Sequence, residues 1–221
     1  INAVTLGKYI PGKIWGLVAR GSRLKLAGLS TKEYVKASFM EQYLLILGCM
    51  ILISISAPLL ITHPLSKLIP AATPIEILIA HKLQKFFFTK YSIITKNKEH
   101  ETPITISLTD FTKLSIMYTL LWVSGGLVFY GVALSSTNIT PSISNLISSI
   151  NANAIGVTAG FLALFAPGGI GVREGSIAAI IAPTMGLTIA LYVTIIYRAF
   201  SIASEILCGT IALSISHRNV K

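Results

Sequence analysis

The sequence has few ionisable side chains, and long parts of it have none. Charged residues make up 12% of the 221 residues, whereas soluble globular domains carry about 25%. Leu114–Val172 is a run of 59 residues without Asp, Glu, Lys, Arg or His, and shorter uncharged runs cover Gln42–Thr62 and Gly175–Tyr197. A bilayer-spanning helix needs about 20 apolar residues. The lack of charge therefore argues against a soluble all-helical core and predicts a membrane protein.

Motifs that mark several other protein classes are missing as well. No P-loop, GxGxxG pattern or Ser/His/Asp grouping is present, and the 4 histidines and 2 cysteines show no metal-ligand spacing. We therefore expect no metal, no cofactor and no catalytic site. The net charge is +10, but no nucleic-acid-binding motif accompanies it, so we expect no nucleic-acid partner. The basic residues flank apolar runs, where Lys and Arg anchor helices and attract anionic lipid headgroups.

What is present is a pattern of apolar helices. The sequence predicts an all-α, polytopic integral membrane bundle in the cell membrane, built as a single domain over residues 1–221. The expected apolar helices are Ala37–Ile61, Leu114–Leu134, Ser142–Phe165 and Leu187–Ser216. The chain begins at Ile1 without an initiator methionine and almost directly on a Pro-Gly motif. We therefore expect the full protein to carry further N-terminal helices.

Residues 63–110 interrupt the apolar pattern with charge and proline. Pro70 and Pro74 break the segment, and Ile75–Phe88 then alternates charged with apolar residues. Such a helix is too charged to span a bilayer, so we expect it at the membrane interface. Lys96–Thr102 predicts a solvated loop. The whole segment is interpreted as an interfacial or loop insertion within the membrane domain.

One segment late in the chain combines helix-breaking residues with charge. The breakers are Pro167, Gly168, Gly169 and Gly171. A broken or re-entrant helix is predicted here, and such backbone is tolerated at membrane depth only when it is buried in protein or lines a wet cavity. Arg173 and Glu174 follow directly, beside a predicted helix start at Gly175–Ser176. Free N–H groups at a helix start plus an arginine suit an anion. The alternative is an interfacial turn with solvated charges.

A second Pro-Gly segment lies near the start of the chain. Pro11-Gly12-Lys13-Ile14 shares the pattern Pro-Gly-x-Ile with Pro167-Gly168-Gly169-Ile170, and Trp15 follows the first copy. About 30 residues after each copy comes an ionisable residue in an apolar helix, Glu41 or Arg198. Repeat-built transporters carry paired broken segments near their substrate site. Either an internal repeat or chance accounts for so short a match.

Three ionisable residues fall within apolar helices: Glu41, Arg198 and Glu205. Arg198 and Glu205 are seven residues apart, so they share one helix face. A charge at bilayer depth is costly and usually faces a cavity or a counter-charge. Two roles stay open for these residues, a place along a substrate path or a structural salt bridge such as Arg198 with Glu174 or Glu41. Separately, Gly156–Gly160 is a GxxxG pattern, which predicts close helix packing.

A known family shows these motifs in the same order. The motifs are Lys8-Tyr-Ile-Pro-Gly-Lys-Ile-Trp15, Glu41-Gln42, Phe165-Ala-Pro-Gly-Gly-Ile-Gly-Val-Arg-Glu-Gly175 and Arg198. Over nearly its whole length the chain resembles the lysylphosphatidylglycerol synthase transmembrane-region family. The resemblance implies an α-helical membrane domain that, in the best-understood members, moves an aminoacylated phospholipid between leaflets. Other members are linked to polyprenyl-phosphate sugar or hopanoid pathways, so the substrate does not transfer with the fold.

The resemblance and the residues together predict a lipid flippase, or a transporter of an anionic or lipid-linked, phosphate-bearing intermediate in cell-envelope biogenesis. The residues expected to bind the headgroup are Pro11, Gly12, Lys13, Trp15, Pro167, Gly168, Gly169, Gly171, Arg173 and Glu174. Glu41, Arg198 and Glu205 are expected to line or brace the path. The expected partners are a phosphate-bearing membrane lipid and an envelope-biosynthesis enzyme.

Two other functions remain as alternatives. One is a membrane-embedded transferase, or its accessory subunit, that acts on a polyprenyl-phosphate lipid or phospholipid with Glu174 or Glu41 as the base. The other is a scaffold for an envelope-assembly complex. The sequence shows no soluble aminoacyl-transfer domain, which favours transport over synthesis.

Overall fold

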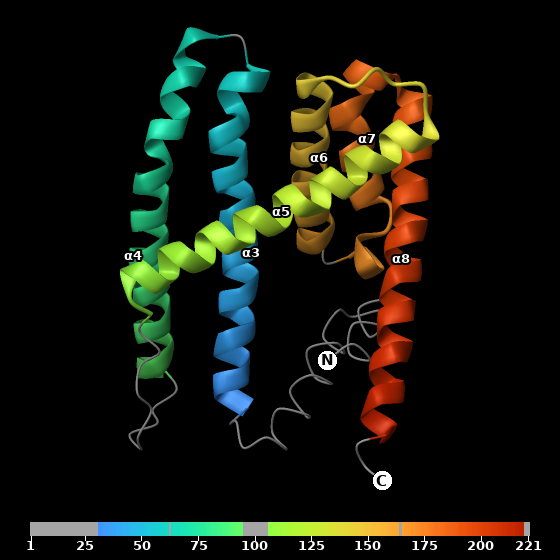
Figure 1. Ribbon diagram of the computed structural model, residues 1–221. Helices are drawn as coiled ribbons and strands as arrows, with labels where there is room; N and C mark the ends of the chain where they lie inside the picture. The colour runs from blue at the N-terminus through green and yellow to red at the C-terminus, as the bar shows by residue number, and fades with distance from the viewer. Residues whose placement is uncertain (1–30, 62, 95–105, 164, 219–221) are drawn as a thin grey trace. The chain divides into compact units, whose positions relative to one another are not determined.

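The computed structural model describes residues 31–61, 63–94, 106–163 and 165–218. Every regular element in these ranges is a helix, as Figure 1 shows, so the predicted all-α class is confirmed. Internal contacts divide the chain into two compact units. One is the Phe39–Ser124 unit, and the other, which we call the C-terminal unit, combines Gly125–Lys221 with Ile1–Ser38.

The Phe39–Ser124 unit is built from helices that share an apolar core. Its elements are α3 (Thr31–Leu60), the 3₁₀ helix η2 (Pro64–Ala72), α4 (Thr73–Ile94) and the first half of α5 (Leu108–Ser136). Leu44 of α3, Ala80 of α4 and Phe111 of α5 meet in the core. The Tyr43 hydroxyl also donates a hydrogen bond to the Ala80 carbonyl, at 2.9 Å. The amphipathic helix predicted at Ile75–Phe88 therefore exists as the longer α4 and packs along α3.

The insertion predicted at residues 63–110 contains η2 and α4. On α4, Lys82, Lys85 and Phe86 are exposed, which is compatible with charged and apolar side chains meeting at a membrane interface. The interfacial position of this segment stays a prediction. The solvated loop predicted at Lys96–Thr102 lies outside the described residues.

In the described part of the C-terminal unit, α5, α6 (Ile143–Leu162), α7 (Val172–Met185) and α8 (Leu187–Arg218) share one core. The unit contains the second half of α5, and the 3₁₀ turn η3 (Pro167–Gly169) precedes α7. Within this unit α7 packs against both α6 and α8, and the three helices stand side by side in Figure 1. Phe129 of α5, Ala152 of α6, Ile177 of α7 and Val193 of α8 are fully buried in the shared core.

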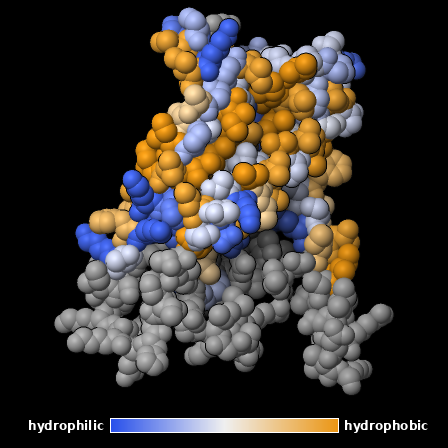
Figure 2. Space-filling model, turned by 60° about the vertical axis from the view of Figure 1, so that its left-hand side comes forward, coloured by the Kyte–Doolittle hydropathy of each residue, from blue (hydrophilic) through white to orange (hydrophobic). Residues whose placement is uncertain are grey.

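Among the described residues, three helices are long and apolar enough to cross a membrane: Tyr34–Leu60, Leu108–Ser136 and Leu187–Cys208. They correspond to three of the four predicted apolar helices. The fourth, predicted at Ser142–Phe165, forms α6 (Ile143–Leu162) but is not among these candidate spans. Large apolar side chains are exposed on these helices, among them Val128 on α5 and Ile195 on α8. Figure 2 shows apolar side chains over much of the visible face. A soluble protein rarely exposes apolar patches of this extent, so the chain is an integral membrane protein.

Candidate functional site

The helical run of the C-terminal unit breaks at the second Pro-Gly motif, as predicted. α6 ends at Leu162, and η3 at Pro167–Gly169 precedes α7. Gly168, Gly169 and Gly171 have φ angles of 61°, 73° and 83°. These angles lie in the left-handed region, where residues with a Cβ are strained. The glycines are therefore required by the backbone of the loop itself.

The start of α7 differs from the prediction. The helix begins at Val172, so the predicted start at Gly175–Ser176 is wrong. Glu174 explains the earlier start because its Oε2 accepts a hydrogen bond from the Gly171 N–H, at 2.7 Å. A carboxylate in this position satisfies an N–H group and complements the positive end of the helix dipole. One of the N–H groups expected to bind an anion is thus already bound to Glu174.

Arg198 of α8 holds the loop from the other side. Its Nη2 donates a hydrogen bond to the Gly168 carbonyl, at 3.1 Å, and its Nε lies 3.4 Å from Oε1 of Glu174. The two side chains are largely buried, with 10% of Arg198 and 16% of Glu174 exposed. Of the two salt bridges considered for Arg198, with Glu174 or with Glu41, the structure shows the one with Glu174. Oε2 of Glu174 thus has a hydrogen bond, and Oε1 has an ion-pair contact with the Arg198 Nε that does not meet hydrogen-bond geometry. These contacts favour a structural role for Glu174 over that of a general base.

Arg173 points to a different residue of α8. Its guanidinium carbon lies 5.7 Å from the centre of the Tyr197 ring, within the range of a cation–π interaction. The Tyr197 hydroxyl donates a long hydrogen bond to the Gly125 carbonyl, at 3.4 Å. The same ring packs edge-on against Phe129, with centroids 5.1 Å apart. Tyr197 is therefore fixed by α5 and presents its face to Arg173.

Two neighbouring residues of α8 thus hold two neighbouring residues of α7. Tyr197 carries Arg173, and Arg198 binds Glu174. Arg173, Glu174 and Arg198 were predicted as site residues from the sequence, but Tyr197 was not. A lone tyrosine in an apolar helix is ordinary, and its place directly before Arg198 was the only available signal.

The charges near the loop balance one another. Arg173 interacts electrostatically with Arg198, Glu174 and Glu205, two acids and one further base. Across the described ranges no carboxylate lies within salt-bridge distance of Arg173. Glu205 is half-buried on α8, two turns beyond Arg198. Arg173 therefore lies near Glu174 and Glu205 but forms no salt bridge with either of them.

Close approach of α6 positions the loop. A Cβ placed on Gly169 would lie 2.8 Å from the Gly160 Cα, and one on Gly160 would lie 2.9 Å from the Arg173 Cβ. A Cβ on Gly156 would overlap the Ile177 side chain. The close packing predicted from the GxxxG pattern is therefore confirmed. Through Gly160, α6 seats both the loop and the first turn of α7.

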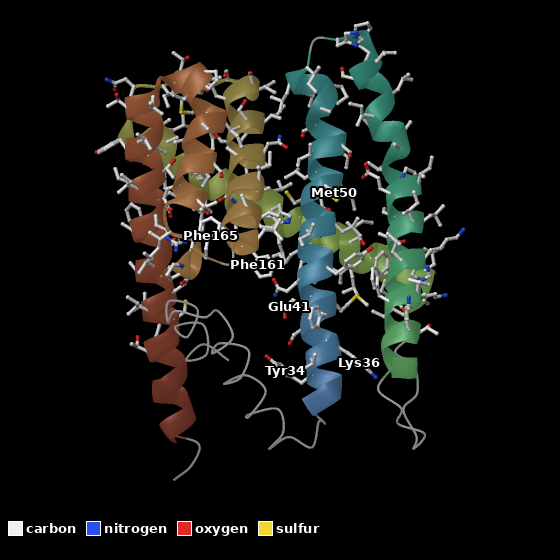
Figure 3. The ribbon with its side chains drawn as sticks, turned by 180° about the vertical axis from the view of Figure 1, so that it is seen from behind. Tyr34, Lys36, Glu41, Met50, Phe161 and Phe165 are labelled. Carbon is white, nitrogen blue, oxygen red and sulfur yellow. The ribbon has the colours of Figure 1, made fainter. Side chains whose placement is uncertain are left out.

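The remaining predicted site residues lie in several different parts of the chain. Pro167 is exposed in η3, and Glu41 is half-buried on α3 within the Phe39–Ser124 unit (Figure 3). The residues of the first Pro-Gly motif, Pro11, Gly12, Lys13 and Trp15, lie outside the described residues. Their relation to the second motif stays a prediction.

Apolar side chains that were not among the predicted site residues also lie at the loop. Phe161 near the end of α6 is 42% exposed, and Phe165 in the following loop is 84% exposed; both are labelled in Figure 3. Ile170 is exposed as well. In a membrane protein such side chains suit contact with lipid chains, so the charged site adjoins an apolar surface.

Comparisons with known proteins agree with the resemblance seen in the motifs. A family model described as the lysylphosphatidylglycerol synthase TM region matches residues 3–209. Searches of curated proteins and of solved structures give no significant match. The family connects the chain with membrane lipids. Because the match covers nearly the whole sequence, the chain belongs to the lysylphosphatidylglycerol synthase transmembrane-region family.

Proposed function

We propose that this chain is a flippase or transporter for a phosphate-bearing membrane lipid, an anionic or lipid-linked intermediate of cell-envelope biogenesis, in the cell membrane. The family, the three apolar helices and the broken segment before α7 support this function. The observation that carries it is Arg173, a guanidinium in the first turn of α7 without an ion pair among the described residues. The enzyme that makes the lipid is the proposed protein partner.

Arg173 suits a phosphate on chemical grounds. A guanidinium keeps its charge in apolar surroundings and binds phosphate oxygens in a bidentate manner. Arg198 does not compete for this role, because it already bonds Gly168 and Glu174. The acids near Arg173 also limit how tightly it holds an anion. Transport needs a site that binds well enough to load and weakly enough to release.

The other residues of the proposed site act around this guanidinium. Glu174 and the loop glycines Gly168, Gly169 and Gly171 shape the backbone beside it, and Pro167 begins the turn. Arg198 and Glu205 brace it from α8. We include Pro11, Gly12, Lys13, Trp15 and Glu41 on their sequence pattern and the family alone.

Arg173→Ala is expected to slow lipid movement about tenfold, which corresponds to about 1.4 kcal/mol of lost interaction with the moving headgroup. The full chain is reconstituted in vesicles that contain phosphatidylglycerol with a fluorescent acyl chain. A membrane-impermeant reductant then quenches the outer-leaflet label, and the further loss of fluorescence reports movement from the inner leaflet. Wild-type protein is expected to give rapid further loss.

Two variants control this measurement. Arg173→Lys keeps the charge but loses the planar fork, so it should retain part of the rate. Lys113→Ala removes an exposed cation whose nearest acid, Asp110, is 3.8 Å away, and it should move lipid at the wild-type rate. Equal rates for wild type and Arg173→Ala would remove Arg173 from the site, and no movement by wild-type protein would contradict flippase activity on this lipid.

Tyr197→Leu is expected to lower the transport rate several-fold, while Tyr197→Phe stays close to wild type. Leucine removes the ring face beneath Arg173, whereas phenylalanine keeps the ring and loses the hydroxyl, with its long hydrogen bond to Gly125 and its hydrogen bond with Arg173. The same vesicle assay measures both. If Tyr197→Phe were as slow as Tyr197→Leu, the hydroxyl rather than the ring would be the important group. If both matched wild type, Tyr197 would not position Arg173.

A further inference from the structure

We propose that the C-terminal unit contains a buried water site, formed by Ser149 and Asn153 of α6 beside Gly125 of α5. Gly125 also accepts the hydrogen bond of the Tyr197 hydroxyl. The site does not depend on the proposed transport function, because it follows from the hydrogen bonding of the helix core.

Two buried polar atoms identify the site. The Ser149 Oγ and the Asn153 Oδ1 are both shielded from solvent and have no hydrogen-bond partner in the described ranges. Ser149 is 0% exposed and Asn153 is 2% exposed. The two residues are four apart on α6, so their side chains lie on one face, one turn from each other. Both side chains therefore enter the core from the same face of α6.

α5 contributes the opposite wall. A Cβ on Gly125 would lie 3.0 Å from the Asn153 Nδ2, and a Cβ on Gly126 would lie 2.5 Å from the Ile150 Cα. These two glycines let the backbones of α5 and α6 come close together. The Cα of Gly125 therefore lies beside the Asn153 amide, and the Gly125 carbonyl accepts a hydrogen bond from the Tyr197 hydroxyl.

Unpaired polar atoms are especially costly in this location. The unit is surrounded by exposed apolar side chains on α5 and α8, so bulk water does not reach these groups. Buried polar groups in proteins are almost always paired with protein atoms or with ordered water. In a membrane this requirement is stricter, since lipid tails offer no hydrogen bonds. A bound molecule that both donates and accepts would meet it.

Water fits the chemistry of this site better than a metal cation. The two side chains of α6 offer a hydroxyl, an amide oxygen and an amide NH₂ group. Water donates to oxygens and accepts from the NH₂ group, and it needs only two to four partners. A hard cation would require more oxygen ligands and would be repelled by the amide hydrogens. In the described ranges no cluster of acidic, His or Cys side chains suited to a metal is present.

The position of the site links it to the Arg173 contact. Tyr197 bonds Gly125 through its hydroxyl and carries Arg173 on its ring. Water held at Ser149 and Asn153 would lie next to the peptide that anchors Tyr197. A continuous series of polar groups would then extend from Arg173 to the centre of α6.

Radical labelling with isotopically marked water tests the proposal directly. A brief X-ray pulse generates hydroxyl radicals from water where it sits, and side chains beside internal water are labelled even when they are buried. Phe129 is 0% exposed, lies one turn from Gly125 on α5 and contacts Tyr197. In the purified full chain we expect labelling of Phe129 at least several-fold above that of Phe111, which is equally buried in the other unit. Equal, background labelling of both rings would overturn the water site.

The matched variant is the double substitution Ser149→Ala and Asn153→Leu, which removes both polar groups with little change in shape. It should reduce Phe129 labelling to the Phe111 level. It should also lower the thermal unfolding midpoint, because hydrogen bonds to water are lost. A higher midpoint in the double variant would show that the Ser149 and Asn153 side chains have neither bound water nor another hydrogen-bond partner in the wild type. Stabilisation of wild type by sodium but not by choline, absent in the double variant, would show a cation in place of water. Either result would overturn the proposal.

Discussion

Gly169→Ala is expected to destabilise the C-terminal unit more than any other small substitution in the loop. Gly169 has a φ of +73°, and its added Cβ would lie 2.8 Å from the backbone of Gly160. The left-handed backbone alone costs about 1–3 kcal/mol for a residue with a Cβ. Overlap with a neighbouring helix backbone adds about 1–3 kcal/mol, because backbone atoms cannot rotate away. We expect a large fall in the thermal unfolding midpoint, measured on detergent-purified protein, and poor yield of folded protein.

Substitutions at two other glycines distinguish the cost of backbone strain from the cost of steric overlap with Gly160. Gly171 has a φ of +83° but nothing within 4 Å of its Cβ position, so Gly171→Ala should show the backbone cost alone. Gly175 has neither a positive φ nor a close neighbour and lies inside α7. Gly175→Ala should therefore raise the midpoint slightly, since alanine is the better helix former. Similar midpoints for Gly169→Ala and Gly171→Ala would show that Gly160 does not press against the loop.

Arg198→Met should cause the second large loss of stability. The change leaves the Gly168 carbonyl and the Glu174 carboxylate without their partner in a largely buried place. Removing one member of a buried ion pair costs about 3–5 kcal/mol, much of it because the other charge stays uncompensated. We expect the unfolding midpoint to fall accordingly, and protease cleavage within the Pro-Gly loop to become faster.

A double-mutant cycle gives the control. Arg198→Met with Glu174→Met removes both charges, so the pair of changes should cost less than the sum of the single ones. Lys113→Met breaks only an exposed pair with Asp110, whose side chains are 72% and 63% exposed, and should cost less than about 1 kcal/mol. Strict additivity of Arg198→Met and Glu174→Met would show that the two residues are not energetically coupled.

The membrane helices were predictable because apolar length is a local property. Uncharged runs located all three candidate spans, but hydropathy placed their ends less well. Leu114 was the predicted start of the second span, whereas α5 begins at Leu108. Ser107 and Asp110 account for the difference, since the Ser107 Oγ accepts from the Asp110 N–H and donates to its carboxylate. Capping of this kind extends a helix into residues that hydropathy assigns to a loop.

The sequence predicted which residues belong to the site but not which of them contact one another. Arg173, Glu174 and Arg198 were all identified, and the order of the motifs indicated the family. Their individual roles were left open, because one sequence does not show which acid a buried arginine meets. The structure pairs Arg198 with Glu174 and places Arg173 on Tyr197. The expected anion site at the start of α7 also changed, since Glu174 binds the Gly171 N–H.

The sequence by itself determined the membrane setting, the all-α class, the break at Pro167–Gly171 and the family. Each depends on residues close together in the chain or on motifs in a fixed order. Only the tertiary structure decided that α8 presents Tyr197 to Arg173 and Arg198 to Glu174, and that Ser149 and Asn153 share one buried place beside Gly125. These contacts depend on how α5, α6, α7 and α8 rotate and approach one another. That geometry is set by packing among many side chains, and no local pattern encodes it.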